Sequence, residues 1–131
     1  MSVQIMRLVL YGEPRTKKNS QRIMRNAQTG QPFIVPSAAY KAYERDCLAQ
    51  LHGGHRLRLS EPVNLRAVYY MPTRRRVDLA NLLEATCDIL VVGGVLADDN
   101  SAIVAAHDGC RVRYDKKNPR VEITIEEVDS R

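Results

Sequence analysis

The sequence predicts a single α+β domain, residues 1–131, with a mixed or antiparallel sheet and two main helices. Three observations lead to this prediction. The length of 131 residues is typical of one domain. The composition, with 44% hydrophobic and 27% charged residues, is that of a globular protein rather than a disordered one. Segments typical of strands flank two segments with helical periodicity, which gives the expected order β-ββ-α-β-α-β-β.

The first half of the chain predicts a strand, a hairpin and a helix. Residues 3–11 are rich in apolar and β-branched side chains, as in a strand. Residues 21–24 and 33–35 flank the turn sequence NAQTGQ, which indicates a β-hairpin. Ser37 is expected to cap a helix that continues to Leu51. One apolar stripe supports this helix: Tyr40, Tyr43, Cys47, Leu48 and Leu51.

The second half predicts a strand, a longer helix and further strands. Residues 63–71 form the expected strand, and an arginine-rich loop follows Pro72. Asp78 is placed to cap a helix over residues 79–92. Beyond the glycines at 93 and 94, we expect strand over 101–113, interrupted near 107–109, and a last strand over 120–128.

The net charge of +5 is unevenly distributed along the chain. Residues 77–110 contain six acidic and no basic side chains, so the remainder carries +11. A basic domain suggests a polyanionic partner, first nucleic acid and second an anionic membrane. Carboxylates gathered inside a basic protein are typical of metal-dependent phosphodiester chemistry. The alternative is a solvated acidic helix face with acidic turns.

Several classes of protein are excluded. No apolar run approaches the roughly 18 residues that a membrane helix needs, and the N-terminus lacks the features of a signal peptide. Cys47, Cys87 and Cys110 are odd in number and widely spaced, which favours the reducing cytoplasm over a disulfide framework. The absence of a CxxC pair argues against a zinc finger. We expect no small-molecule cofactor.

The candidate site lies around the second helix. Asp78 is at its start, and Asp98 and Asp99 follow in the turn after it. A helix of about 14 residues is only about 21 Å long, so the returning chain can bring this pair back beside Asp78. Converging carboxylates would bind Mg²⁺ or Mn²⁺ and activate water. The alternative is that the three residues only cap the helix and form a turn.

These residues resemble the RusA-type Holliday junction resolvases of phages and prophages over nearly the whole chain. The matching motifs are the polar loop with Pro14, Lys17, Lys18 and Asn19, the block MPTRRRVDLANL at 71–82, Asp88, and LADDN at 96–100. The resemblance implies a homodimer that cuts four-way DNA junctions with Mg²⁺. Each protomer would nick one strand and leave a 3′-hydroxyl and a 5′-phosphate.

The resemblance assigns Asp78 and Asp99 to the catalytic aspartates. Ala80 stands where the family has an aspartate, and Glu84 where it has a lysine. We therefore expect Asp78, Asp99 and Glu84 to form the metal site, with help from Asp98 or Asp88. The missing lysine would be replaced by Lys17 or Lys18, with Lys18 the catalytic candidate; the alternative is that both only grip the DNA backbone.

The expected DNA contacts extend along two basic segments. They are Lys17, Lys18, Asn19, Arg22, Arg74, Arg75 and Arg76. Tyr40, Tyr43, Tyr69 and Tyr70 are expected to pack in the core rather than stack on bases. The sequence thus predicts a structure-selective endodeoxyribonuclease acting on Holliday junctions in DNA recombination and repair. The alternatives are a branched-DNA-binding protein with weak or no cleavage and, as a third choice, a metal-dependent ribonuclease.

Overall fold

The sheet at the centre of the molecule is mixed, as expected. The computed structural model describes residues 3–17, 21–36 and 38–128, with only the backbone described at 21–23 and 34–36. Five strands form the main sheet: β1 (Gln4–Tyr11), β4 (Val63–Met71), β5 (Val104–Ala106), β6 (Arg111–Tyr114) and β7 (Arg120–Glu127). Strand β7 lies between β1 and β4 and is antiparallel to both, whereas β5 and β6 pair with β4 in parallel.

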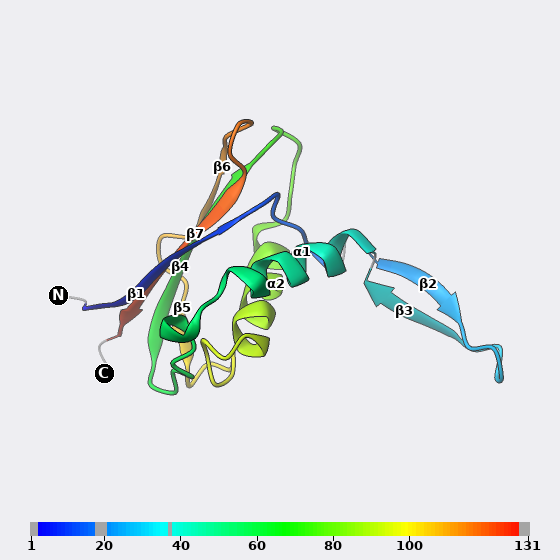
Figure 1. Cartoon of the computed structure of the whole chain (residues 1–131), viewed down its shortest axis with the longest axis horizontal. Helices are drawn as coiled ribbons and strands as arrows, with labels where there is room; N and C mark the ends of the chain where they lie inside the picture. Colours follow the sequence, from blue (N-terminus) through cyan, green and yellow to red (C-terminus); the bar gives the residue numbers. More distant parts are fainter. Residues whose placement is uncertain (1–2, 18–20, 37, 129–131) are drawn as a thin grey trace.

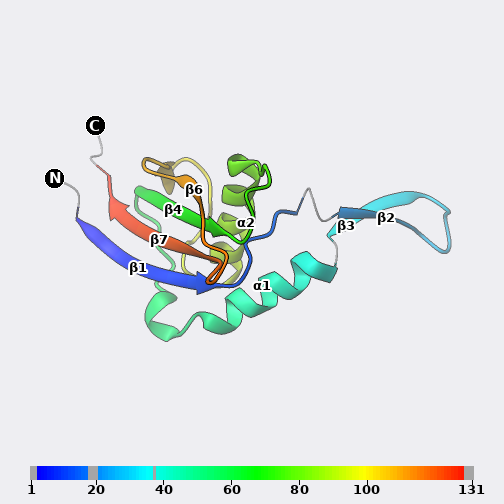
Figure 2. The same cartoon turned by 90° about the horizontal axis from the view of Figure 1, so that it is seen from above.

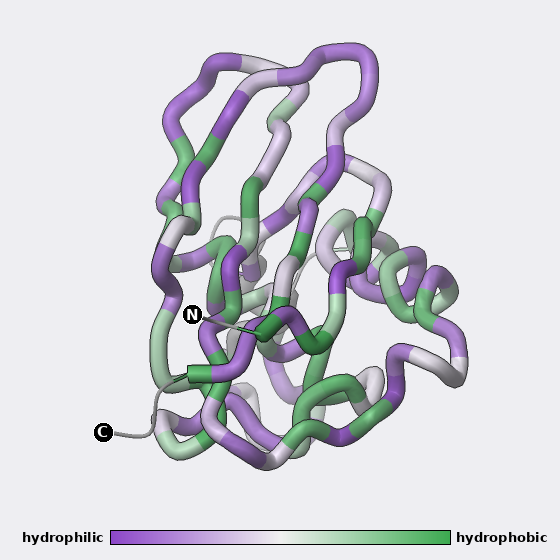
Figure 3. The backbone as a smooth tube through the Cα atoms, turned by 90° about the vertical axis from the view of Figure 1, so that its left-hand side faces the viewer, coloured by the Kyte–Doolittle hydropathy of each residue, from purple (hydrophilic) through white to green (hydrophobic). Residues whose placement is uncertain are grey.

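Both helices, α1 (Ala38–Gln50) and α2 (Leu79–Val92), lie on the same side of this sheet (Figures 1 and 2). Side chains alternate along each strand, so one face of β4 is buried and the other is partly exposed. The alternation of hydrophilic and hydrophobic residues is visible along the strands in Figure 3. The buried face includes Val63, Leu65, Ala67 and Tyr69. The fold is therefore a single α+β domain with one covered and one open sheet face.

The core confirms the predicted packing of three of the four tyrosines. Tyr40 and Tyr43 of α1 and Tyr69 of β4 are buried. The Tyr69 hydroxyl lies 2.7 Å from the Thr86 hydroxyl of α2, so the buried phenol group has a hydrogen-bond partner. Tyr70 instead faces the open side of the sheet, where the Arg120 guanidinium stacks 3.8 Å from its ring centroid.

Helix α2 begins and ends close to the predicted residues. Its C-terminal cap, Gly93, lies against α1: a Cβ there would lie 3.2 Å from Leu48 Cδ2 and would also run into Leu51. A side chain at 93 would require Leu51 and Leu48 to shift, whereas the φ of −76° is accessible to any residue. The following Gly94 has φ +78°, which turns the chain back.

The predicted hairpin forms a separate two-stranded sheet of β2 (Gln21–Arg25) and β3 (Pro32–Pro36) that projects from the body (Figure 1). In its turn, Asn26 Oδ1 accepts hydrogen bonds from the backbone N–H groups of Gln28 and Thr29. Met24 and Phe33 pair across the hairpin and are both exposed.

Two local predictions need correction. Residues 101–103 form a turn rather than a strand, because Asn100 accepts backbone hydrogen bonds from Ala102, Ile103 and Val104. A 3₁₀-helix at Gly53–His55 (η2) follows α1 and was not predicted. The predicted interruption near 107–109 is confirmed, since it separates β5 from β6. Ser37, the expected cap of α1, lies outside the described residues.

Within the described residues, no helix has the length and apolar character required to cross a membrane.

Candidate active site

A hollow of about 280 Å³ lies against the exposed side of α2. Its lining residues are Ala80, Leu83, Glu84, Cys87, Asp99 and His107. Asp99 follows the helix in sequence, yet it lies beside the first three turns of that helix. The chain therefore returns along α2 after Gly94 and places Asp99 and Glu84 on the walls of one hollow. The sequence led us to expect Asp98 and Asp99 beside Asp78, but neither Asp78 nor Asp98 is among the residues that line this hollow.

Asp78 caps α2 two residues before Ala80. Its Oδ1 accepts a hydrogen bond from the Asn81 N–H at 3.2 Å, and its carbonyl accepts one from Leu82. This confirms the predicted N-cap. A carboxylate has two oxygens, so a cap made through Oδ1 is compatible with a ligand role for Oδ2.

Asp98 has a different role from its neighbour. Its Oδ1 accepts a hydrogen bond from the Asp99 N–H at 2.8 Å, and its Oδ2 accepts one from the Asn100 amide at 2.9 Å. The Asp99 N–H, and then the Asn100 amide, lower the pKa of the Asp98 carboxyl. Asp98 is not among the residues that line the hollow, so it shapes the turn that presents Asp99.

Cys87 is buried and is one of the residues that line the hollow. Burial raises its pKa to about 12, and the nearby carboxylates of Asp99 and Asp88 add to the effect. A thiol is a metal ligand as the thiolate. Cys87 is therefore a protonated packing residue near neutral pH.

The donor set of the hollow fits a hard divalent cation. Mg²⁺ keeps several waters and is usually held by one or two carboxylates together with substrate phosphates. Glu84 and Asp99 provide two carboxylates, with Asp78 at the start of the same helix. Within the described residues, no three His, Cys, Asp or Glu side chains converge on one point. Bound water and DNA phosphate would therefore complete the coordination shell.

Lys17 is tied to the acidic face of α2. Its Nζ donates a hydrogen bond to Asp88 Oδ2 at 2.7 Å, and it lies 5.8 Å from the centre of the Tyr40 ring. Both members of this ion pair are about one-third exposed. The contact fixes the segment that leads into the basic loop. Of the other predicted contacts there, Lys18 and Asn19 lie outside the described residues, and of Arg22 only the backbone, in β2, is described.

The predicted arginine run forms the exposed loop between β4 and α2. The Arg74 guanidinium stacks on Tyr114, 4.2 Å from its ring centroid. Arg75 and Arg76 line a small hollow near the start of α2 together with Arg15, which was not predicted as a site residue. In the described ranges, no carboxylate forms an ion pair with Arg74, Arg75 or Arg76.

On the open face of the sheet, the arginines are paired with carboxylates. Arg120 lies 2.9 Å from both Asp115 and Glu122, and Arg7 lies 3.5 Å from Glu122. These contacts come from residues of β1, β7 and the turn before β7.

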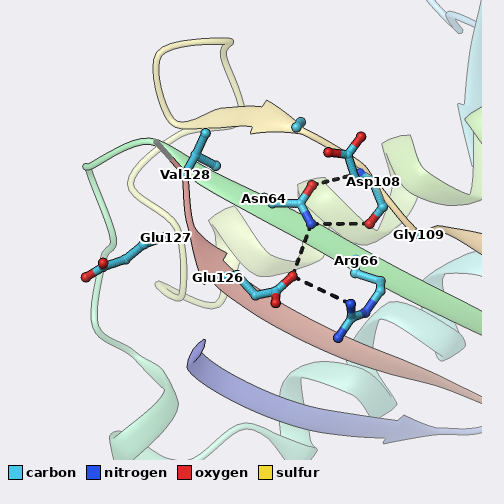
Figure 4. Close-up of a pocket in the computed structure, with 8 residues that line it drawn as sticks. Asn64, Arg66, Asp108, Gly109, Glu126, Glu127 and Val128 are labelled. Atoms are coloured by element: carbon cyan, nitrogen blue, oxygen red, sulfur yellow. Dashed lines mark hydrogen bonds and ion pairs between the residues drawn. The ribbon is translucent and has the colours of Figure 1, made fainter. Parts of the chain in front are cut away.

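A larger hollow of about 510 Å³ on this face has a similar network (Figure 4). Arg66 pairs with Glu126 at 3.6 Å, and Asn64 bridges Glu126 and the backbone of Asp108. The polar groups here bond one another, so we place the candidate site at α2.

The fold and the site define a small basic protein in which a hollow with two carboxylates lies on a helix that follows an arginine loop. This arrangement suits the binding and cleavage of phosphodiesters. The family model of endodeoxyribonuclease RusA matches residues 12–126. The crossover junction endodeoxyribonuclease rusA of Enterobacteria phage 82 is 38% identical over 94 residues, which cover 70% of this chain and 75% of that protein. The chain belongs to the RusA endodeoxyribonuclease family, which confirms the resemblance.

His107 is the site residue that the sequence did not identify. It lines the hollow with Glu84 and Asp99, and its ring contacts the carbonyl of Leu65, 42 residues away, which no local sequence pattern indicates.

Proposed function

We propose that this protein is a structure-selective endodeoxyribonuclease that resolves four-way DNA junctions during recombination and repair. The observation that carries the proposal is the position of Asp99. A turn that follows α2 returns it to a hollow shared with Glu84, on the helix that Asp78 caps. Family membership supports the same reaction.

We assign the metal site to Asp78, Glu84 and Asp99, with Mg²⁺ as the expected ion and Mn²⁺ as its substitute. Asp98 supports this set by holding the turn through both of its oxygens. When bound, the ion supplies a water of lowered pKa and stabilises negative charge on the phosphate. The protein contributes the position of the carboxylates.

Substrate binding is assigned to the arginine loop and the basic segment before β2. Arg74, Arg75 and Arg76 would contact phosphates that flank the cut. Lys17 is a positioning residue in this proposal because Asp88 already holds its Nζ. Lys18, next in sequence, is the candidate that neutralises charge on the scissile phosphate.

A homodimer is part of the proposal. A four-way junction offers two equivalent strands, and a two-fold pair of subunits presents two equivalent sites. We also infer a cytoplasmic protein. Its three cysteines are free thiols, and two of them are buried in the core.

A cleavage assay on a synthetic four-way junction tests the proposed function. Wild type and Asp78→Asn are incubated with the junction, with and without Mg²⁺, and binding is measured in parallel. We expect symmetric nicking by wild type with Mg²⁺ only, and junction binding by both proteins. Binding without nicking by wild type across several metals and junction sequences would contradict the proposal, and so would preferred cleavage of RNA.

Ala80 supports one alternative, a junction-binding protein without nuclease activity. Ala80 lines the hollow, and it stands where the family has an aspartate. Under that alternative, Ala80→Asp would create cleavage activity that wild type lacks. Under our proposal, wild type already cleaves.

A further inference from the structure

Tyr114, the last residue of β6, contacts the first arginine of the loop that leads into α2. The Arg74 guanidinium lies over the Tyr114 ring, 4.2 Å from the ring centroid. Tyr114 pairs with Met71, the last residue of β4, and the arginine loop follows Met71 directly. The contact therefore joins this loop to the neighbouring strand within three residues of the point where the loop leaves the sheet.

The end of β6 that carries Tyr114 is itself fixed to the sheet. The Asp115 N–H, next in the chain, donates a hydrogen bond to the Met71 carbonyl at 2.8 Å. The Asp115 carboxylate accepts one from Arg120 at 2.9 Å, and Arg120 stacks on Tyr70 of β4. The turn between β6 and β7 and the arginine loop lie at the same end of the sheet (Figure 1). Tyr114 is therefore attached to a part of the sheet that several contacts hold together.

The stack leaves Arg74 able to bind an anion. A guanidinium is planar, with its five N–H donors around the edge, so a ring that covers one face leaves the edge accessible to a phosphate. Both side chains are exposed at the surface. Among the described residues, no carboxylate forms an ion pair with Arg74. Arg74 thus has a plane fixed by Tyr114 and an edge that no described carboxylate occupies.

Tyr70 makes the same kind of stack, but with an arginine whose donors are used within the fold. The Arg120 guanidinium lies 3.8 Å from the Tyr70 ring centroid. Its N–H groups donate at 2.9 Å to three acceptors: the carboxylates of Asp115 and Glu122 and the Asn118 carbonyl. The two tyrosines therefore differ in whether the stacked guanidinium already has carboxylate partners, and Tyr70 provides a matched control for Tyr114.

We propose that Tyr114 is a positioning residue for DNA binding, which holds Arg74 so that the edge of its guanidinium meets a backbone phosphate of the junction. The inference rests on the DNA binding of the proposed function. An arginine whose side chain is already held loses less conformational entropy when it binds, so the stack raises affinity for DNA. In this proposal the Tyr114 ring itself does not contact DNA, and Tyr114 is not among the residues that line the hollow with Asp99.

Junction binding by the full-length protein over a series of salt concentrations tests the inference. Arg74→Ala should reduce the slope of log affinity against log salt by about one, because it removes one phosphate contact. Tyr114→Leu removes no charge, yet it should weaken binding about three- to fivefold and reduce the slope in the same direction. Tyr114→Phe, which keeps the ring, and Tyr70→Leu should each bind within about 1.5-fold of wild type.

A double variant distinguishes positioning from a direct contact between the ring and DNA. If Tyr114 acts through Arg74, then Tyr114→Leu added to Arg74→Ala should weaken binding by less than about 1.5-fold further. A further loss as large as that of Tyr114→Leu alone would mean that the ring contacts DNA itself, and would overturn the inference.

Single-turnover cleavage at saturating protein provides a second readout. Tyr114→Leu should change this rate by less than about twofold, because the loss lies in binding and not in the chemical step. A reduced rate at saturation together with unchanged affinity would contradict the positioning role. Urea denaturation checks that each variant is folded, and Tyr114→Ile, with a residue suited to a strand, is used if the Leu variant unfolds.

Two further results would overturn the inference: wild-type affinity and slope in Tyr114→Leu, or equal losses in Tyr114→Leu and Tyr70→Leu. Failure of the proposed function is a separate result. A wild type that nicks junctions while Tyr114→Leu binds normally refutes the positioning role alone. A wild type that shows the expected binding effects without Mg²⁺-dependent nicking refutes the nuclease alone.

Discussion

The open face of the sheet and the loop that leads into α2 both carry arginines, but among the described residues only those on the open face form ion pairs with carboxylates. On the open face, Arg7, Arg66 and Arg120 each lie within 3.6 Å of a carboxylate oxygen. In the loop that leads into α2, Arg75 and Arg76 have no such partner among the described residues. A paired guanidinium must give up its carboxylate before it binds a phosphate. The pairing of the charges therefore supports the proposal that DNA contacts the loop before α2 rather than the open face of the sheet.

The largest effect is expected at the carboxylates of the hollow. Asp99→Asn should reduce junction cleavage by at least about 100-fold, because outer-shell changes alone cost metal sites 10–100-fold. Junction binding should remain within a few-fold of wild type. Single-turnover cleavage and a gel-shift titration measure the two quantities.

Asp98→Asn is the matched control for this prediction. Its carboxylate holds the turn and does not line the hollow, so the loss of cleavage should be clearly smaller than for Asp99. Equal losses for the two variants would mean that the turn geometry, rather than a ligand at 99, accounts for the effect.

The second prediction compares arginines across the two regions. Arg75→Ala and Arg76→Ala should each reduce the slope of log affinity against log salt by about one. Arg7→Ala and Arg66→Ala should leave the slope unchanged. Junction binding measured over a series of salt concentrations decides this point.

If Arg7→Ala and Arg66→Ala change the slope of log affinity against log salt as much as Arg75→Ala and Arg76→Ala do, the proposed difference between the two regions is wrong. In that case DNA would contact both sides of the sheet.

A third, smaller effect concerns the ion pairs of the open face. Hydrogen bonding from Arg120 lowers the pKa of the Asp115 carboxyl. A carboxylate whose pKa is lower in the folded state stabilises the fold above its unfolded pKa and loses this contribution as pH falls through the folded pKa. Asp115→Asn should therefore unfold at lower urea concentration than wild type at pH 7.

The difference between the two proteins should shrink as the pH falls below about 4, since wild type then loses the same charge. Urea denaturation at a series of pH values gives the profile. A difference that does not vary with pH would mean that Asp115 acts through its turn rather than through Arg120. Its Oδ1 accepts hydrogen bonds from the Lys117 and Asn118 N–H groups, which an Asn oxygen can also accept.

The smallest effect is expected at the ion pair that joins the basic segment to α2. A double-mutant cycle with Lys17→Met and Asp88→Asn should give a coupling free energy of about 0.5 kcal/mol, because both groups are partly solvated. The same variants should slow cleavage more than they weaken junction binding, if Lys17 positions the loop. Coupling near zero together with unchanged cleavage would remove the positioning role.

The sequence was sufficient to predict α2 and its surroundings, because local rules govern them. Asp78 caps the helix through the N–H of Asn81, three residues away, and apolar spacing identifies the buried side of α2. The same periodicity correctly placed Tyr40 and Tyr43 in the core. The return of the chain along the helix was predictable from the short length of the helix, but the expected meeting of Asp99 with Asp78 was not: Asp99 shares a hollow with Glu84, and Asp78 is not among its lining residues.

Other features depended on contacts between distant residues. Residues 101–103 were predicted to be a strand, but Asn100 accepts hydrogen bonds from the backbone N–H groups that a strand would use for pairing. The pairing of Arg7 with Glu122 joins residues 115 positions apart, and the position of His107 depends on Leu65. Such contacts are set by sheet register, which the hydrophobic pattern of one segment does not specify.

Gly93 has a consequence for how this sequence can change. Its absent side chain lets the end of α2 pack against α1, because a Cβ there would lie 3.2 Å from Leu48 Cδ2 of α1. A larger residue would shift the point where the chain leaves the helix, and Asp99 emerges six residues later. We therefore expect a larger residue at position 93 to displace Leu48 and Leu51, although this position lies at the far end of the helix from Asp78. Selection for catalysis would then act on a residue that does not line the hollow.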